Sequence, residues 1–356
     1  MSKHPVVSVL MSVFNGEHHL AVALESVLEQ TFADFEFIVI DDGSTDSTWE
    51  ILADYASRHS RMRLLRHDSN MGLTRALNRG LEMARGRYVA RQDADDISLP
   101  ERFSRQLGYL KLHPDIGLLG TGTRAVTQAG TIKWTIRPPV ESMLIGWRLL
   151  FESCFAHSSV MFRSSVLRKT GPYAEDFVYA QDFELWSRMS AHTKLANLPE
   201  VLVHRCIGPH SMSTSRAREQ SLAAARVIQG NSSRLSGRDV PFVVACNVHR
   251  VTRGEALTDA NAILEVASLV RRLLAVYLHA ANPDAVTSRL IRHDAASKLY
   301  LLAGQNLKTS RRACMRTIWQ AEEIDARLPS LRTLTSMIRQ YLGKNRAETA
   351  LSDASR

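Results

Sequence analysis

Apolar and polar positions along the first 120 residues predict strands and helices in alternation. Continuous apolar, β-branched runs predict strands over residues 6–12, 35–40, 62–65 and 88–91. Apolar residues at helical spacing predict helices over 20–28, 47–57, 74–84 and from Pro100 to about His113. Strands that alternate with helices of this length pack as right-handed βαβ units, so we expect an α/β fold with a mostly parallel sheet.

The pattern loosens after Gly120. It predicts strands over 131–137, 159–162 and 201–205, and helices over 141–151 and 183–190. From about Ser215 onward it predicts helices rich in Ala, Leu and Arg, with loops at 230–237, 281–284 and 328–329. We therefore predict an α/β domain over 1–214, with halves that meet near residue 120, and a basic α-helical region over 215–356.

Charge is distributed unevenly between these two regions. The chain of 356 residues carries 45 Lys and Arg against 36 Asp and Glu. Residues 1–200 hold 22 basic and 24 acidic side chains, whereas residues 201–356 hold 23 basic and 12 acidic ones. A basic surface is therefore expected only in the C-terminal region. We predict no nucleic-acid partner, because this region shows neither an aromatic stacking platform nor a recognised binding motif.

Neither a secretion signal nor a membrane span is predicted. The residues after Met1 lack a long apolar stretch and a small-residue cleavage site. The most apolar window, 262–281, is interrupted by Glu265, Arg271 and Arg272, so it predicts a core-facing or interfacial helix. The four cysteines are far apart and form no Cys-x-x-Cys pair, which argues against a zinc site or a disulfide framework. These features predict a cytoplasmic protein.

Two acidic clusters come directly after predicted strands. Asp41 and Asp42 follow the strand 35–40, where ligands of open α/β sheets bind, and adjacent carboxylates there can accept from ring N–H or sugar hydroxyl groups. A polar turn with a helix cap is the alternative. Asp93, Asp95 and Asp96 follow the strand 88–91. Mg²⁺ or Mn²⁺ would relieve the mutual repulsion of these three carboxylates and neutralise a bound diphosphate; a solvated acidic turn is the alternative.

A third motif, QDFELW at 181–186, lies in the less regular second half. Asp182 fits a helix N-cap with Phe183 and Trp186 packed below it, and it also fits a general base. These two roles are compatible.

Taken together in order, these motifs resemble family 2 glycosyltransferases. The resemblance rests on residues 7–17, 26–32, 38–48 (IVIDDGSTDST), 70–80, 86–102 and 181–186 and covers about residues 6–210. It implies the GT-A fold and transfer of a sugar from a nucleotide-diphosphate donor with inversion at the anomeric carbon.

The resemblance also assigns site residues. Those it implies for the nucleotide sugar are Ser12, Phe14, Glu17, Asp41, Asp42, Arg75, Asp93, Ala94 and Asp95. It implies Asp182 as the general base and Asp95, Asp96 and His210 as ligands of Mn²⁺ or Mg²⁺. His157 is a further candidate, and for each histidine a satisfied loop residue is the alternative. Phe14 stands where the family often has Tyr, and Gln181 where it often has Glu.

We therefore expect a metal-dependent enzyme that adds single sugars, with a UDP-sugar favoured as donor and a saccharide or lipid-linked acceptor. Its expected role is synthesis of surface polysaccharide, lipopolysaccharide or glycolipid. The arginines of the C-terminal helices could rest on anionic lipid at the inner face of the membrane; a solvated face or a homo-oligomer interface is the alternative. Two rival functions are a sugar-phosphate nucleotidyltransferase and a catalytically silent scaffold that docks partners through its basic helices.

Overall fold

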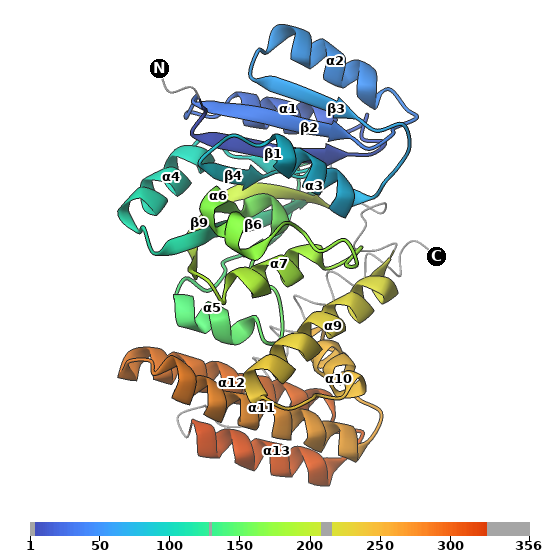
Figure 1. Cartoon of the computed structure of the whole chain (residues 1–356). Helices are drawn as coiled ribbons and strands as arrows, with labels where there is room; N and C mark the ends of the chain where they lie inside the picture. Colours follow the sequence, from blue (N-terminus) through green and yellow to red (C-terminus); the bar gives the residue numbers. More distant parts are fainter. Residues whose placement is uncertain (1–3, 128–129, 208–215, 326–356) are drawn as a thin grey trace. The chain divides into compact units, whose positions relative to one another are not determined.

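The structure is a computed structural model that describes residues 4–127, 130–207 and 216–325 (Figure 1). Internal contacts divide the chain into two compact units. The first, the sheet unit, comprises Met1–Ser142 and Ser153–Gly208. The second, the helical unit, comprises Met143–Glu152 and Pro209–Arg356. The predicted boundary at residue 214 lies outside the described residues and stays a prediction.

The sheet unit is built on one mixed sheet, which has nine strands within the described residues. They are β1 (Val7–Val13), β2 (Phe35–Asp41), β3 (Met62–Arg66), β4 (Tyr88–Arg91), β5 (Ile97–Ser98), β6 (Ile116–Thr127), β7 (Ile132–Ile136), β8 (Met161–Arg163) and β9 (Lys194–Ile207). The order is β3-β2-β1-β4-β8-β6-β9-β5, and β7 pairs with β6.

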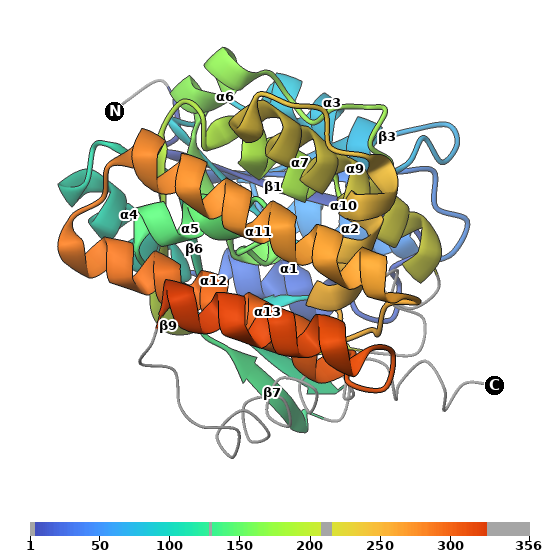
Figure 2. The same cartoon turned by 90° about the horizontal axis from the view of Figure 1, so that it is seen from below.

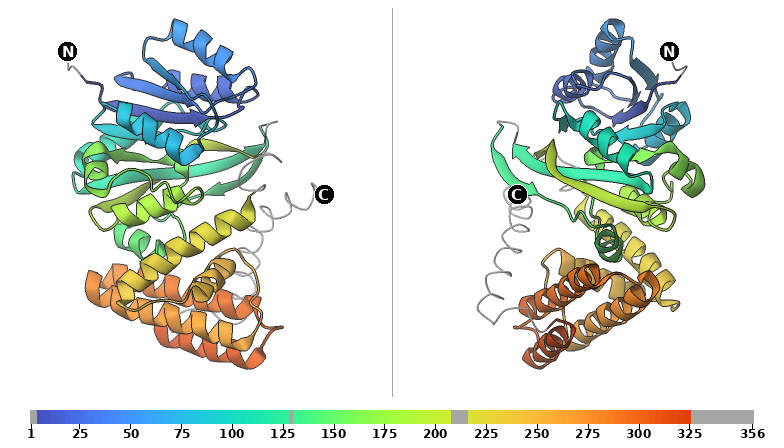
Figure 3. Two further views of the ribbon diagram at one scale, coloured as in Figure 1. Left: turned by 45° about the vertical axis from the view of Figure 1, so that its right-hand side comes forward. Right: turned by 90° about the vertical axis from the view of Figure 1, so that its left-hand side faces the viewer.

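Strand direction changes where the two halves of the sheet meet. Strands β3, β2, β1 and β4 are parallel, as the βαβ pattern predicts, and β8 runs antiparallel to both β4 and β6. Beyond β8, β6 and β9 are parallel to each other. Every residue of β1 and β2 is buried, because helices cover both faces of the sheet (Figure 3).

The helices of this unit lie on the two faces of the sheet. They are α1 (Leu20–Leu28), α2 (Thr48–Arg58), α3 (Leu73–Met83), α4 (Arg102–Leu112), the short 3-10 helix η1 (His157–Ser159), α6 (Ser164–Thr170) and α7 (Gln181–Met189). Residues of α1 and α4, such as Leu24 and Phe103, share one core with Val9 and Phe37 of the central strands. Burial of this apolar surface is the main force that fixes the strand ends at which the site lies.

The helical unit contains α5 (Ser142–Arg148) and the C-terminal helices. The first residue of α5, Ser142, is also the last residue of the first segment of the sheet unit. These are α9 (Ala217–Ser236), α10 (Phe242–Thr252), α11 (Ala260–Ala281), α12 (Ala285–Gln305) and α13 (Arg311–Ile324). Helices α11, α12 and α13 lie side by side (Figure 2). Asp259, Asp284 and Ser310 cap their N-termini with side-chain hydrogen bonds.

Most predicted elements are confirmed within a few residues, including α11 as a helix with a core-facing side. The expected loop at 230–237 is wrong, because α9 continues to Ser236. None of the helices that the structure describes is both long and apolar enough to cross a bilayer.

Candidate active site

The carboxyl ends of β1, β2 and β4 meet at one edge of the sheet unit. Val13 at the end of β1 pairs with Asp41 at the end of β2, and Leu10 pairs with Arg91 at the end of β4. The Asp42 amide donates to the Val13 carbonyl (2.8 Å), which ties the first acidic cluster to the neighbouring strand. Both acidic clusters therefore follow strands at the edge where open α/β sheets bind their ligands.

Hydrogen bonds join the loops that follow β1 and β2. The Asn15 side-chain carbonyl accepts from the Thr45 amide (2.9 Å), and the Glu17 carboxylate accepts from the Ser47 amide (3.1 Å). Glu17 therefore braces the loops against each other. Phe14, beside these contacts, is 46% exposed and offers an uncovered aromatic face at this edge.

The carboxylate of Asp42 is held in place by three donors from the chain segment after β3. Its Oδ1 lies 2.7 Å from Nδ1 of His67 and accepts from the Met71 amide (2.9 Å), and its Oδ2 accepts from the Gly72 amide (2.8 Å). Carboxylate oxygens can accept further hydrogen bonds, so a base-edge N–H remains compatible with this arrangement. Asp41 is fully buried and accepts from the backbone of its own turn (3.0 Å).

Both carboxylate oxygens of Asp93, the first acidic residue of the second cluster, have protein partners. Its Oδ1 lies 2.5 Å from a guanidinium nitrogen of Arg91, and its Oδ2 accepts from the Ser158 hydroxyl (2.5 Å). Burial by itself would raise the pKa of Asp93, but the charge of Arg91 and the Ser158 hydrogen bond lower that pKa to about 2. Asp93 is therefore ionised at neutral pH and anchors β4 to η1.

The pKa values of Asp95 and Asp96 are raised, in contrast to that of Asp93. Burial, followed by the charge of Asp93, raises the pKa of Asp95 to about 6. Burial and the charges of Asp93 and Asp95 raise the pKa of Asp96 to about 8. The charge of Arg205 on β9 lowers the pKa of all three carboxyls, though less strongly. Burial and mutual repulsion therefore disfavour the charged forms of Asp95 and Asp96.

This donor set suits a hard divalent cation that shares its coordination with a ligand. No group of three His, Cys, Asp or Glu side chains in the described part of the chain is arranged to hold a metal ion. Asp95 takes no hydrogen bond from another residue in this part, and Asp96 accepts from the Cys206 amide (3.0 Å). Mg²⁺ commonly binds through one or two carboxylates plus substrate phosphates, so Asp95 and Asp96 fit such a site. His210 lies outside the described residues.

Asp182 lies in the first turn of α7, next to a strained backbone position. Ala180, which precedes the helix, has a left-handed conformation (φ 54°) that non-glycine residues rarely adopt. The Asp182 carboxylate accepts from the Phe183 amide (2.8 Å). Burial and the charge of Asp93 raise the pKa of Asp182, and the hydrogen bond from Phe183 partly offsets this rise. A carboxyl group with a raised pKa near an acidic, ligand-binding edge is suited to general-base work.

His157 lies beside this helix and is held neutral. Its Nε2 is 2.9 Å from the Tyr173 hydroxyl, and its ring packs edge-on against those of Tyr173 and Trp186. Burial and the charge of Arg91 lower the pKa of His157 to about 3. The structure therefore gives His157 a packing and hydrogen-bonding role in the wall of the site.

The remaining predicted residues differ in their surroundings. Ser12 is buried in β1, and Ala94 is half-buried between the carboxylates. Arg75 is 55% exposed and pairs with Glu175 (3.3 Å). This ion pair links α3 to the loop before α7.

Arg102 and Arg91 were not singled out from the sequence, although both are fully buried near the second cluster. Arg102 donates only to neutral groups, among them the carbonyls of Arg91 (2.8 Å) and Val160 (3.1 Å). Burial, reinforced by the charge of Arg91, lowers the pKa of Arg102 to about 9. The only hint in the sequence was a charged residue at the end of an apolar strand.

A mixed α/β sheet of this order, with acidic loops at its carboxyl edge and a C-terminal helical region, is the GT-A class of fold. Residues 8–171 match the family model described as glycosyl transferase family 2. Together with the relatives below, this match shows that the chain belongs to family 2 of the glycosyltransferases.

Two curated relatives support this membership. The chain is 35% identical to the putative glycosyltransferase EpsE of Bacillus subtilis over 53% of this chain and 68% of that protein. It is 31% identical to the O-antigen biosynthesis glycosyltransferase WbnJ of Escherichia coli over 60% of this chain and 83% of that protein. The chain is therefore a glycosyltransferase, and one of these relatives is named for O-antigen biosynthesis.

Solved structures support the fold. Staphylococcus aureus TarS residues 1–349, in complex with UDP-GlcNAc, aligns with a TM-score of 0.56 at 15% identity and covers 89% of this chain and 90% of that one. The mannosyltransferase PcManGT of Pyrobaculum calidifontis, in complex with GDP-Man and Mn²⁺, aligns with a TM-score of 0.53 at 17% identity, over 92% of this chain and 89% of that one.

Proposed function

We propose that this chain is an inverting, metal-dependent glycosyltransferase that moves one sugar from a nucleotide-diphosphate sugar to an acceptor hydroxyl. The observation that carries the proposal is that neighbouring carboxyl groups of the sheet unit have pKa values shifted in opposite directions. Asp93 is held ionised by Arg91, while loss of solvation and the negative charge of Asp93 raise the pKa values of Asp95, Asp96 and Asp182. Such clusters gather at functional sites.

In this proposal Asp182 acts on the acceptor. Its carboxylate takes the proton from the acceptor hydroxyl as that oxygen attacks the anomeric carbon of the donor sugar. The bond between the anomeric carbon and the diphosphate oxygen breaks on the opposite face, so configuration is inverted. The electron pair leaves with the nucleoside diphosphate.

The other site residues bind the donor in this proposal. Phe14 stacks on the nucleotide base, and Asp42, already oriented by three donors, accepts from the edge of the base. Asp95 and Asp96 would hold Mn²⁺ or Mg²⁺, which when bound stabilises the charge of the departing diphosphate. Arg205, whose charge acts on the same carboxyls, adds a positive charge near that position.

The relatives support the donor class and the biological role. WbnJ is named for O-antigen biosynthesis, and TarS and PcManGT are described in complex with UDP-GlcNAc and with GDP-Man and Mn²⁺. We propose a nucleotide-sugar donor for this chain, a UDP-sugar first, and a saccharide or lipid-linked acceptor in surface polysaccharide or glycolipid synthesis. Family membership also favours sugar transfer over nucleotidyl transfer.

A thermal-shift panel of UDP-, GDP- and dTDP-sugars with and without Mn²⁺ tests this proposal. A ligand that binds only the native protein raises the melting temperature, so one nucleotide class should raise it, and more so with Mn²⁺. The same donor should then be consumed in the presence of acceptor. Donor binding without any transfer would favour the silent scaffold, and no binding by any donor would contradict the proposal.

Asp95→Ala tests the metal site separately. Loss of one of the two proposed ligands should weaken Mn²⁺-dependent donor binding by about 10–100-fold, in line with the cost of disturbing a metal site. Asp54→Ala, an exposed carboxylate on α2, is the matched control. If both the wild type and the Asp95 variant bound the donor equally well with and without Mn²⁺, the metal would have no part in the mechanism.

We also propose that the helical unit binds anionic lipid through α13. Met315 and Trp319 of this helix are each 61% exposed, and the neighbouring Arg312 and Arg316 are exposed as well. Exposed aromatic and basic side chains on one helix are typical of contact with a negatively charged membrane surface.

Co-sedimentation with phosphatidylglycerol and phosphatidylcholine vesicles tests this binding. The wild type should bind the anionic vesicles, and binding should fall as salt is raised. Arg312→Glu/Arg316→Glu should lose most of it, whereas Arg58→Glu/Arg105→Glu in the sheet unit should not. Equal binding of both variants would contradict the proposal.

A further inference from the structure

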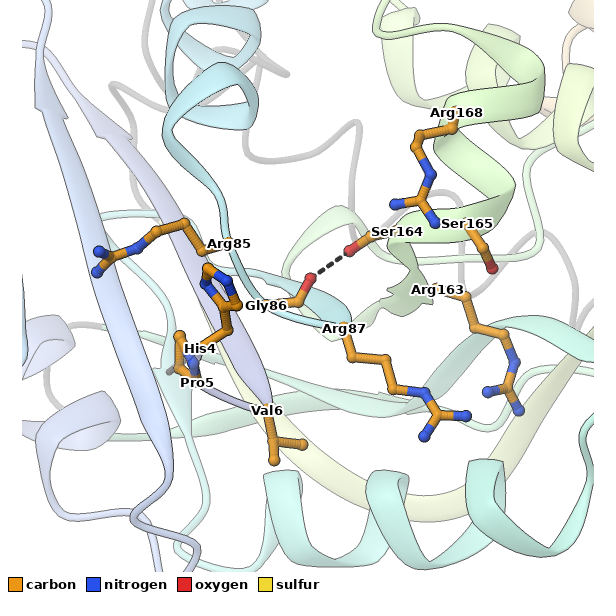
Figure 4. A pocket seen from close by; sticks show the side chains of 10 residues that line it. All are labelled: His4, Pro5, Val6, Arg85, Gly86, Arg87, Arg163, Ser164, Ser165 and Arg168. Atoms are coloured by element: carbon orange, nitrogen blue, oxygen red, sulfur yellow. Dashed lines mark hydrogen bonds between the residues drawn. The ribbon is translucent and has the colours of Figure 1, made fainter. Parts of the chain in front are cut away.

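A cavity of about 610 Å³ lies at the edge of the sheet unit opposite the candidate active site (Figure 4). It is lined by residues before β1, before β4 and from the end of β8 into α6. Because β8 runs antiparallel to β4 and pairs Arg163 with Tyr88, it brings Ser164 to the amino end of β4. The Ser164 hydroxyl donates to the Gly86 carbonyl (2.6 Å) and joins the two walls.

The lining of this cavity is strongly basic. Arg85, Arg87, Arg163 and Arg168 all line it, and no Asp or Glu side chain is among the described lining residues. Arg163 is occupied by backbone carbonyls, including that of Ile116 (2.8 Å), and Arg85 pairs with Glu36 (2.9 Å).

The other two arginines have no such partners. Neither the Arg87 nor the Arg168 side chain forms an ion pair or hydrogen bond with any residue that the structure describes, and both are exposed. Arg87 lies only near the Tyr88 ring, at 5.7 Å from its centroid. Two guanidinium groups without counter-charges beside the exposed Ser165 hydroxyl offer fork-shaped donors of the kind that bind phosphate.

The cavity is separate from the donor site. Strand β4 (Tyr88–Arg91) lies between Arg87 and Asp93, and its four residues alone extend over about 13 Å. The cavity volume falls in the range of small-ligand pockets and exceeds the size of one inorganic phosphate. A pocket lined by one sign of charge also concentrates counter-ions.

We propose that this cavity is a second anion site that binds a phosphorylated ligand of diphosphate size through Arg87 and Arg168. The ligand is either a soluble diphosphate compound or the phosphate headgroup of an anionic lipid, since both present the same chemistry to the two guanidinium groups. The site is independent of the proposed transfer reaction and uses none of its residues.

Calorimetric titration of the full chain with inorganic pyrophosphate, in EDTA, tests the proposal. EDTA removes the divalent cation that would recruit pyrophosphate to Asp95 and Asp96. The wild type should bind pyrophosphate, and Arg87→Ala/Arg168→Ala should weaken that binding at least about tenfold, because charge-assisted hydrogen bonds to phosphate are lost. The variant should fold normally, since neither side chain forms an ion pair or hydrogen bond within the described structure.

The control is Arg58→Ala/Arg105→Ala, which removes the same charge from exposed ion pairs of the same unit and should leave affinity unchanged. Vesicles of phosphatidylglycerol distinguish the two sources. If Arg87→Ala/Arg168→Ala loses pyrophosphate binding but still binds vesicles, the ligand is a soluble diphosphate compound. If the same variant also loses vesicle binding, the ligand is a lipid headgroup. No pyrophosphate binding by the wild type, or equal affinity of the two double variants, would overturn the proposal.

Discussion

At the scale of single residues, burial gives similar carboxyl groups different tasks. Asp93 and Asp182 are both aspartates near Arg91, yet the pKa of Asp93 is lowered and that of Asp182 is raised. The difference arises because Asp93 contacts the Arg91 guanidinium directly, whereas Asp182 accepts only a backbone hydrogen bond. An ionised anchor and the proposed proton acceptor therefore lie near each other.

Asp182→Asn should lower the transfer rate by about 10²–10⁴-fold, the usual contribution of a general base, and leave donor affinity unchanged. A base must be ionised, so wild-type turnover should fall as the pH drops through the raised pKa of Asp182. This acidic limb should lie above the usual aspartate range near pH 4. Turnover and donor binding are measured from pH 5 to 8.

Asp176→Asn is the matched control for this prediction, since it makes the same chemical change on the loop that precedes α7, at an exposed position. Its pH profile should follow that of the wild type. Full turnover by Asp182→Asn would remove Asp182 from the role of base.

The sequence predicted which residues carry charge at the site, but not how they are paired. Asp42, Asp93 and Asp182 stand in local motifs that could be recognised one at a time. The partners of these carboxylates, such as His67 and Ser158, are 25 and 65 residues away along the chain. Pairing over such distances depends on the fold, and no local pattern encodes it.

At the scale of elements, α3 holds the loop that presents α7. The Asn78 side chain donates to the Tyr173 carbonyl (2.9 Å) and accepts from the Tyr173 amide (3.0 Å). The Thr74 hydroxyl donates to the Phe177 carbonyl (2.9 Å) in the same loop. These bonds fix a backbone that reaches the left-handed Ala180, and so set the position of Asp182.

Asn78→Ala should lower the free energy of unfolding by about 1–3 kcal/mol, because it leaves two buried backbone groups of Tyr173 without partners. It should also lower kcat more than it raises the KM for the donor, since the loop carries the proposed base. Urea denaturation and steady-state kinetics measure the two effects.

Arg79→Ala, exposed on the same helix next to Glu82, is the control and should change neither quantity. If Asn78→Ala lost stability while kcat stayed at the wild-type value, the loop would not position Asp182.

Strand β6 shows why the second half of the fold was harder to predict. Gly117, Gly120 and Gly122 interrupt its apolar run, so the pattern read as irregular. In the structure a Cβ atom at Gly120 would lie 2.1 Å from the Asn197 side chain, and one at Gly122 would lie 2.9 Å from the Glu200 carbonyl. The glycines allow β9 to approach closely, a requirement visible only once both strands are paired.

At the scale of the whole molecule, the chain divides its charge between two units of different composition. The sheet unit carries its acidic residues at strand ends, while the C-terminal helices carry an excess of Arg and Lys. The short segment Met143–Glu152 belongs by its contacts to the helical unit, although the sequence on both sides of it belongs to the sheet unit. The segment Met143–Glu152, which ends a few residues before His157, therefore depends for its packing on the helical unit.

Asp294 on α12 is the polar centre of the helical unit. It is buried and accepts from the Trp147 indole (2.8 Å) and from Arg148 (2.7 Å) on α5, and Lys298 lies 3.4 Å away. Burial alone would raise the pKa of Asp294, but the charges of Lys298 and Arg148, with the hydrogen bonds, lower it. A lowered pKa in the folded state means that Asp294 stabilises the protein above the unfolded-state pKa of about 3.9, and that this contribution is lost as the pH falls through the folded-state value.

Asp294→Asn should therefore lower the free energy of unfolding at pH 7 by about 3–5 kcal/mol, because it takes the buried carboxylate away from Arg148, while Lys298 keeps its ion pair with Glu152 (2.9 Å). The difference from the wild type should shrink as the pH falls below about 4, because the unfolded wild-type chain takes up a proton at Asp294 there, while the folded protein keeps this carboxylate charged until the lower folded-state pKa is reached. Urea midpoints compared at pH 7 and at the lowest pH that keeps the wild type folded measure both effects. Asp259→Asn makes the same change at an exposed helix cap, where Asn serves as well as Asp, and should leave the midpoint unchanged. A wild-type midpoint for Asp294→Asn at pH 7 would show that α5 is held by its apolar contacts alone.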